Sequence, residues 1–323
     1  MANAFATVGT QDVNVLISQI NQRLNTEMPK MGSVYKEIAF TDSTSNAKFQ
    51  HYPIHITSFN FNQVLAFESA EYVKPAVIDI VVPGVDYKTP LEMQSLGAFD
   101  DPYNIIKRQA PDFIRVLSRV FDRELAKLIN SNGLAYDGQP FFGVHSSNPS
   151  NPGAPNNNNI VPNAGANKNG VLQAILRLQS MIGYDGKLLM PDLNYQDITF
   201  VVPSIKEKIG ISEVIHAGLT AEAVGATSGG STDTRLAGYG NIVVMPELID
   251  TKVAGSDRRW YAIASGMKNS LPALIVRDFK FPQLRFVAPN QWLDHQRLAQ
   301  AFYGEAAGGV GFALPTTIVR CDY

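Results

Sequence analysis

A long amphipathic stretch constrains the fold of this chain more than any other part of its sequence. Apolar residues recur every three or four positions between Pro111 and Asn132, and this stripe consists of Ile114, Leu117, Phe121, Leu125 and Leu128. The spacing is typical of an α-helix that buries one broad face. Pro111 suits the first turn of a helix, and Gly133 suits the left-handed position just past the last turn. The sequence therefore predicts a long helix over residues 111–132 that needs a core to pack on.

The other face of this predicted helix carries charged side chains. They are Arg115, Arg119, Asp122, Arg123, Glu124 and Lys127. Arg119 and Arg123 are like charges one turn apart, and such pairs weaken an isolated helix. A face of this kind usually meets water, but it can also contact another subunit. Arg119 and Arg123 are therefore candidate inter-subunit contacts.

The segment directly after the predicted helix combines a turn with paired aromatic residues. It reads Tyr136-Asp137-Gly138-Gln139-Pro140-Phe141-Phe142 and is followed by His145. Asp-Gly is typical of a tight turn, and the two phenylalanines are expected to enter a core. After a long helix, this pattern resembles the signature of the Mu-like phage major head proteins, a group within the tailed-phage capsid proteins of the Hong Kong 97 type. The resemblance is best over residues 100–144 and extends through 260–286.

The resemblance implies an α+β fold of the Hong Kong 97 type. A strand that begins with Trp260 and Tyr261 matches the closing part of the Mu-like proteins, which implies that both residues lie in the core. The implied parts are an N-terminal arm and helix at 1–33, an extended two-stranded loop at 34–70, a peripheral domain with the spine helix at 71–147 and 241–323, and an axial domain at 165–240.

The same resemblance implies a function in assembly. Many copies of the chain would form the pentamers and hexamers of an icosahedral phage head around double-stranded DNA, with no cofactor. Scaffold, portal and decoration proteins are the further partners that such a head can have, and its location is the virion after assembly in the host cytoplasm. An encapsulin-like bacterial compartment is the alternative within this fold. From a different class, the alternative is an α/β enzyme with a flexible loop at Gly218–Gly240.

Residues 38–67 alternate between apolar and polar side chains, as in Ile54-His55-Ile56-Thr57 and Phe59-Asn60-Phe61-Asn62. This period indicates extended strands. A two-stranded ribbon is only marginally stable by itself, so we expect a second subunit to cover its apolar side. The candidate inter-subunit contacts are Ile54, Ile56, Phe59 and Phe61. His51 and His55 are interpreted as strand surface, because Pro53 disfavours a helix that would pair them on one face.

Residues 72–82 are predicted to form a strand, and the nearly continuous apolar residues at 77–82 indicate that it is buried on both faces or lies at the centre of a sheet. The segment 83–101 is rich in glycine and proline and is predicted to be a loop. Residues 146–170 contain four consecutive asparagines at 156–159 and are predicted to be an exposed loop that separates two domains. Most of the remaining chain is predicted to be short strands, at 199–203, 241–245, 259–265, 273–277, 279–287 and 314–320.

Two glycine-rich segments lack the spacing of a phosphate-binding loop. The segment 218–240 is expected to be a mobile loop, and the resemblance makes it a candidate for the axis of a ring of subunits through Gly225, Gly229 and Gly230. The segment Gly308-Gly309-Val310-Gly311 is expected to be a bend between strands.

Charge and motif content favour a structural role over catalysis. The chain has 27 basic and 29 acidic residues, which gives no basis for a strongly basic surface that would bind nucleic acid. We therefore expect any enclosed DNA to be held without sequence-specific binding. No serine nucleophile elbow is present, the histidines are scattered, and the only cysteine is Cys321, so we expect no catalytic, cofactor or metal site and no intrachain disulfide. The chain also lacks an apolar run of about 18 residues and a secretion signal, so no membrane partner is expected.

Overall fold

The computed structural model describes residues 33–56, 76–94, 115–151, 153–215, 240–253, 255–286 and 299–323, with isolated positions 18, 21, 22 and 26. The predicted arm at 1–32 lies outside the described residues except for those isolated positions. The same is true of Phe59 and Phe61 in the predicted loop, and of Gly225, Gly229 and Gly230 in the predicted ring-axis segment.

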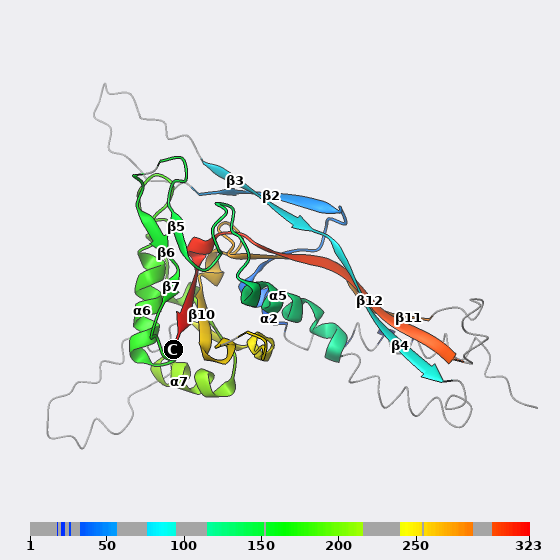
Figure 1. Ribbon diagram of the computed structural model, residues 1–323. Coiled ribbons are helices and arrows are strands. Elements are labelled where there is room, and N and C mark those ends of the chain that lie inside the picture. Colours follow the sequence, from blue (N-terminus) through cyan, green and yellow to red (C-terminus); the bar gives the residue numbers. More distant parts are fainter. Residues whose placement is uncertain are drawn as a thin grey trace, which may run out of the picture.

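Two sheets and the helices beside them organise the described chain (Figure 1). The helices are α2 (Val34–Ile38), α5 (Val120–Ser131), α6 (Lys168–Gln179) and α7 (Ile205–Ile215). The first strands are β1 (Phe40–Asp42), β2 (Phe49–His55), β3 (Val77–Pro83), β4 (Val85–Gln94), β5 (Val144–Ser146) and β6 (Asn156–Asn158). The later strands are β7 (Ile160–Val161), β8 (Thr199–Val202), β9 (Asn241–Val244), β10 (Arg259–Ile263), β11 (Leu274–Phe286), β12 (Ala299–Phe312) and β13 (Ile318–Asp322).

A five-stranded sheet in the order β7-β13-β10-β8-β9 forms the centre of the compact part. Its side chains alternate between two cores, as strand geometry requires. In β10, Trp260 and Ala262 face the core lined by α6 and α7, whereas Tyr261 and Ile263 face the core lined by α5. Both faces are covered, which explains why these strands read as nearly continuous apolar runs.

The aromatic pair that opens β10 lies fully inside the protein. Trp260 and Tyr261 are 0% and 1% exposed, so the burial implied by the resemblance is confirmed. The indole N–H of Trp260 donates to the Ala164 carbonyl at 2.8 Å, which satisfies the one polar group of that side chain.

The same sheet crosses the domain boundary that the sequence suggested at residue 240. Thr199 of β8 pairs with Asn241 of β9, and Val201 pairs with Tyr261 of β10. Strands of four or five residues have too little surface to form a core alone, so strands from both sides of the boundary share one sheet. The paired strands are far apart in the sequence, so the residue pattern of one strand does not reveal which strand it pairs with.

The second sheet has the order β1-β11-β12-β4 and extends away from the compact part (Figure 1). The strands predicted at 273–277 and 279–287 are one long strand, β11, with irregular pairing near Arg277 and Lys280. Two predictions for this sheet were wrong. The segment at 83–101 contains strand β4 rather than only loop, and the glycines 308–311 lie inside strand β12 rather than at a bend.

The glycines of β12 allow two neighbours to approach the strand from different sides. A Cβ atom on Gly308 would lie 2.3 Å from Cε1 of Phe121 in α5, and one on Gly309 would lie 2.0 Å from the Pro83 carbonyl oxygen of β3. Real Cβ atoms do not approach this closely, so any side chain at these positions would separate the packed elements. Glycine here permits close packing of a strand.

Strands β2 and β3 form an antiparallel ribbon that crosses above the second sheet (Figure 1). The burial of β3 alternates, so the prediction of a strand buried on both faces was wrong. Among the described residues, only one face of the ribbon is covered by other parts of the chain. Ile54 and Ile56, chosen as inter-subunit contacts, are 5% and 7% exposed and pack in the chain's own core with Ile275 and Leu314.

The predicted spine helix is confirmed in its second half but is not one uninterrupted element. Residues 115–118 are helical, Arg119 departs from helical geometry (φ −102°, ψ 12°), and α5 continues from Val120 to Ser131. The left-handed residue at its end is Asn132 (φ 45°) rather than Gly133. The Asn132 side chain accepts from the Phe142 N–H at 2.6 Å and donates to the Phe142 carbonyl at 3.3 Å, which stabilises this conformation.

Candidate functional site

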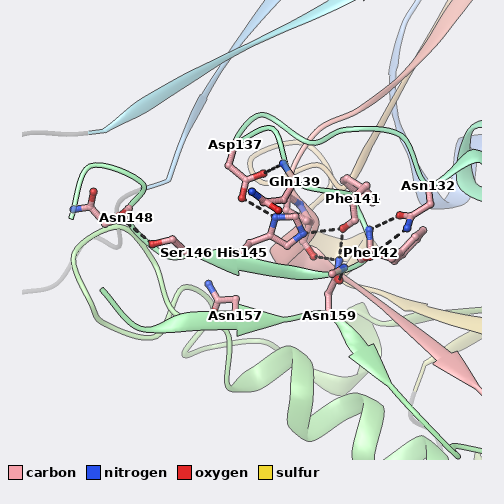
Figure 2. Close-up of polar contacts among 12 residues, drawn as sticks. Asn132, Asp137, Gln139, Phe141, Phe142, His145, Ser146, Asn148, Asn157 and Asn159 are labelled. Atoms are coloured by element: carbon pink, nitrogen blue, oxygen red, sulfur yellow. Dashed lines mark hydrogen bonds and ion pairs between the residues drawn. The ribbon is translucent and has the colours of Figure 1, made fainter. Parts of the chain in front are cut away.

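The motif after α5 forms a compact hairpin whose side chains hold its own backbone (Figure 2). The Ala135 N–H donates to the Gln139 carbonyl at 2.8 Å, and Gly138 adopts φ 75°. An Asp137 carboxylate oxygen accepts from the Gln139 N–H at 3.1 Å. Aspartate and glycine favour such a turn because one can bond to the backbone and the other can adopt positive φ.

His145 lies between two acceptors that belong to this hairpin (Figure 2). Its Nδ1 is 2.8 Å from an Asp137 carboxylate oxygen, and its Nε2 is 3.0 Å from the Phe141 carbonyl oxygen. The imidazole satisfies both acceptors at once only when both ring nitrogens carry a hydrogen. The side chains of His145 and Asp137 are 1% and 6% exposed. This pair therefore fixes the end of the hairpin from inside the protein and is not open to a substrate.

Two asparagines of the 156–159 run continue this buried polar network, although the sequence predicted an exposed loop. Asn157 and Asn159 are 4% and 1% exposed. The Asn159 side chain donates to the Phe141 carbonyl and accepts from the Gly143 N–H, at 2.9 and 2.8 Å. The Asn157 side chain bonds in the same way to both backbone groups of Ile182, each at 2.8 Å. An amide side chain offers both a donor and an acceptor, so it can bond to the N–H and the carbonyl of one residue as the backbone of a neighbouring strand would.

Catalytic and metal chemistry find little support in the described residues. The part of the chain that the structure describes contains no group of three histidine, cysteine, aspartate or glutamate residues placed to bind a metal ion. Cys321 is fully buried, and burial raises the pKa of its thiol far above the ordinary value. Within the described ranges, no helix is both long and apolar enough to cross a bilayer.

The predicted contact residues that the structure describes do not gather into one surface. Arg119 forms an ion pair with Glu247 of the same chain, with Nη1 and Oε1 3.0 Å apart, whereas Arg123 on the same helix is exposed. Asp122, predicted on the polar face, is 0% exposed and accepts from the Tyr35 N–H of α2. The polar face of α5 is thus partly occupied by α2 and by the segment around Glu247.

Sequence reasoning missed the outward face of the β2–β3 ribbon. Exposed apolar side chains of this ribbon and of the adjoining β4 are Phe49, Val77, Val81 and Val85, which are 55%, 49%, 46% and 43% exposed. We call these four residues the outer ribbon face. The period of two that located the ribbon also predicts two faces, but the sequence does not tell which of them the chain itself covers.

Comparison with known proteins identifies the architecture. No protein-family model matches the chain, and no curated protein matches it in sequence. The capsid structure of the Cyanophage P-SCSP1u matches with a TM-score of 0.56 and 11% identity, over 90% of this chain and 88% of that chain. The mature capsid of bacteriophage PhiM1 matches with a TM-score of 0.53 and 11% identity, over 90% and 87%. The virus-like particle from Pyrococcus furiosus matches with a TM-score of 0.51 and 12% identity, over 95% and 99%.

Identities this low transfer no individual residue, but the similarity extends over most of each chain. The chain therefore has the Hong Kong 97 type of fold that phage capsid proteins share, as the sequence resemblance implied.

Proposed function

We propose that this chain is the major capsid protein of a tailed phage and that its copies assemble into a closed icosahedral shell. The observation that carries this proposal is the likeness of almost the whole chain to the subunits of two phage capsids. A fold alone does not define a function. The buried His145–Asp137 pair makes its hydrogen bonds within the hairpin and is closed to a substrate, which agrees with an assembly role for this motif.

The outer ribbon face is our proposed inter-subunit contact, in place of Ile54 and Ile56. Its four apolar side chains are about half exposed in the single chain, and burying them at about 25 cal/mol per Å² would stabilise a contact between copies. Arg123 is a second proposed contact, because it is exposed on α5 and has no structural role in the described contacts. Pentamers and hexamers, the peripheral and axial domains, and any scaffold, portal or decoration partner are parts of the same proposal.

The experiment for this interface is a charge placed on the outer ribbon face. Val81→Asp should prevent closed shells, because a carboxylate would have to be desolvated in the contact. Val81→Thr is the matched control, since threonine keeps the shape and the strand propensity of valine. Electron microscopy reports shell formation, and urea unfolding of the unassembled subunit reports folding. Normal shells from folded Val81→Asp would contradict this role of the outer ribbon face.

We also propose that the shell encloses DNA by confinement and without sequence readout. The chain carries 27 basic and 29 acidic residues, so tight electrostatic binding would require an unusual gathering of the basic ones. Binding of unassembled subunits to duplex DNA should therefore be weak at about 200 mM salt, where a protein that contacts many phosphates has already lost about 10³ in affinity relative to 50 mM. Submicromolar binding at the higher salt would contradict confinement as the means of retention.

Gly225, Gly229 and Gly230 remain our proposed ring-axis residues on the strength of the family resemblance alone. Since the only native thiol, Cys321, is buried, Gly229→Cys would introduce a single accessible thiol. A short bismaleimide should then link neighbouring copies in assembled particles. Links should be absent in the parent chain, and their absence from the assembled variant would place this segment away from the axis.

A compartment shell around protein cargo is the second candidate, because the chain also matches the virus-like particle from Pyrococcus furiosus over 95% and 99% of the two chains. Particles purified from the native source distinguish the two. Nuclease-protected double-stranded DNA would support the phage head, whereas protein cargo without DNA would support the compartment. A small soluble protein that forms no particle from its native source would refute both.

A further inference from the structure

Two parts of the chain repeat the same helix-and-hairpin structure with a constant separation of 48 residues. Helices α5 and α6 both contain 12 residues, and each is followed by a Tyr-Asp-Gly hairpin, at Tyr136 and at Tyr184. The two glycines adopt nearly equal left-handed angles, φ 75° at Gly138 and φ 78° at Gly186. The isolated bridges Leu134–Pro140 and Ile182–Leu188 also occupy equivalent positions.

The hydrogen bonds of the two hairpins correspond one to one. The bond from Ala135 N–H to the Gln139 carbonyl (2.8 Å) corresponds to that from Gly183 to Lys187 (2.7 Å). The bond from Gly138 N–H to the Ala135 carbonyl corresponds to that from Gly186 to Gly183, both 3.0 Å. The aspartate side chains match too, since Asp137 accepts from Gln139 and Asp185 accepts from Lys187, at 3.1 and 3.3 Å.

Both hairpins pack on one apolar cluster, which includes the covered face of the ribbon. Tyr136 and Tyr184 pack against the apolar cluster that contains Ile54, Ile56 and Ile80 of the covered ribbon face. The second hairpin also bonds to the ribbon directly, because the Tyr184 N–H donates to the Ile56 carbonyl at 3.2 Å. This bond lies at the end of the ribbon where β2 ends and β3 begins, and the cluster under both tyrosines includes Ile54 and Ile56 from the same end.

The asparagine run joins the two hairpins to each other. Asn159 bonds to the first hairpin through Phe141 and Gly143, and Asn157 bonds to the second through Ile182. Since both asparagines belong to one short segment, the spacing between the hairpins is fixed.

The opposite end of the ribbon has a separate attachment. The buried guanidinium of Arg277 donates to the carbonyls of Val82, Ser45 and Ala47, at 2.9, 3.0 and 2.7 Å. Removing the hairpin contacts should therefore release one end of the ribbon while the other end stays attached.

We propose that the two Tyr-Asp-Gly hairpins form a paired seat that sets the direction in which the β2–β3 ribbon leaves the body. Tyr136 and Tyr184 are its positioning residues, and Asn157 and Asn159 hold the two halves at a fixed distance. The consequence for assembly rests on the proposed function: the seat decides where the outer ribbon face meets its neighbour.

Hydrogen exchange of the unassembled full chain tests the seat independently of shell formation. In the double variant Tyr136→Ala/Tyr184→Ala, exchange at residues 54–56 and 76–78 should accelerate by at least about tenfold relative to the parent. Exchange at 259–263 and at 82–84 should change much less, because the sheet and Arg277 are untouched. Tyr136→Phe/Tyr184→Phe keeps the rings and should behave like the parent.

Tyr87→Ala is the matched control, since Tyr87 is also partly buried but packs with Phe121 in a different core. It should leave exchange at 54–56 at the rate of the parent. Unchanged exchange at the ribbon end of the double alanine variant would overturn the proposal. The double variant could also exchange faster throughout the chain or fail to fold. In either case, exchange at the rate of the parent in the single variant Tyr184→Ala would overturn the proposal. Electron microscopy of the same variants tests the proposed function instead. If the ribbon end exchanges faster but the shells are normal, the seat still holds the ribbon, but it is not needed for assembly.

Discussion

Asp122 provides the sharpest test of the structure by substitution. Its carboxylate is fully buried, and one of its oxygens accepts from the Tyr35 N–H at 2.9 Å. It therefore caps α2, whose own N-cap residue Ser33 makes no side-chain cap bond. Burial, reinforced by the nearby Glu247, raises the pKa of Asp122 from 3.8 to about 6, although the hydrogen bond from the Tyr35 N–H and the charge of Arg119 act in the opposite direction.

The sign of the resulting pH dependence follows from proton linkage. The folded chain binds the Asp122 proton more tightly than the unfolded chain, so this group's contribution to stability is fully present below about pH 4 and is lost as the pH rises through about 6. One pKa unit corresponds to about 1.36 kcal/mol, so the loss is on the order of 3 kcal/mol. Asp122→Asn removes the titration but keeps an oxygen that can accept from Tyr35.

Urea unfolding of the unassembled subunit between pH 4 and pH 7 measures this contribution. The stability of the parent minus that of Asp122→Asn should decrease by about 3 kcal/mol from the lower to the higher pH. Subtraction removes the contribution of other groups, such as Asp42 and Glu207, whose lowered pKa values act in the opposite sense. Glu124→Gln, on the same helix, gives the effect of losing any one carboxylate from α5. A difference that stays constant within about 1 kcal/mol, or that grows with pH, would refute the reasoning.

Three other substitutions or reactions test separate contacts. Gly309→Ala should destabilise the chain by about 1–3 kcal/mol or more in urea unfolding, because the added methyl would lie 2.0 Å from the Pro83 oxygen. Gly153→Ala is the control and should be nearly neutral, since the nearest atom to its added methyl is 3.6 Å away. Arg277→Lys should cost about 3 kcal/mol, since an ammonium group cannot reach all three carbonyls that the guanidinium binds, and a cost below about 1 kcal/mol would contradict that geometry. The Cys321 thiol, whose pKa burial raises, should react with a thiol reagent only after unfolding, and rapid reaction of the folded chain would contradict its burial.

The sequence predicted the elements whose burial pattern is local. The stripe through Leu117, Phe121 and Leu125 predicted a helix, and all three residues are buried at 3% exposure or less. The apolar run at 199–203 predicted a strand, and β8 spans Thr199–Val202. In each case the residues that carry the signal also form the element, so no distant contact is needed to interpret them.

Features that depend on distant partners could not be predicted. Asn157 and Asn159 have the composition of an exposed loop, and only their bonds to Ile182 and Phe141 make them internal. Asp122 lies on the polar side of its helix, but α2 covers it from a segment more than 80 residues away. Strand β12 was missed because glycine and alanine at 304–309 have low strand propensity, while its neighbours require small residues there. The Tyr-Asp-Gly repeat was present in the sequence and would have been found by comparing the chain with itself.

The order of strands in the five-stranded sheet has a consequence for the timing of folding. Strand β13 lies between β7 and β10 and contributes Ile318 to one core and Val319 to the other. During synthesis, β7 and β10 leave the ribosome before the strand that joins them exists. Neither core can close until residues 318–322 have emerged, so earlier intermediates expose apolar surface and are natural clients for chaperones. A chain released too early would lack the strand that both cores share, and quality control could remove it before it reached an assembly.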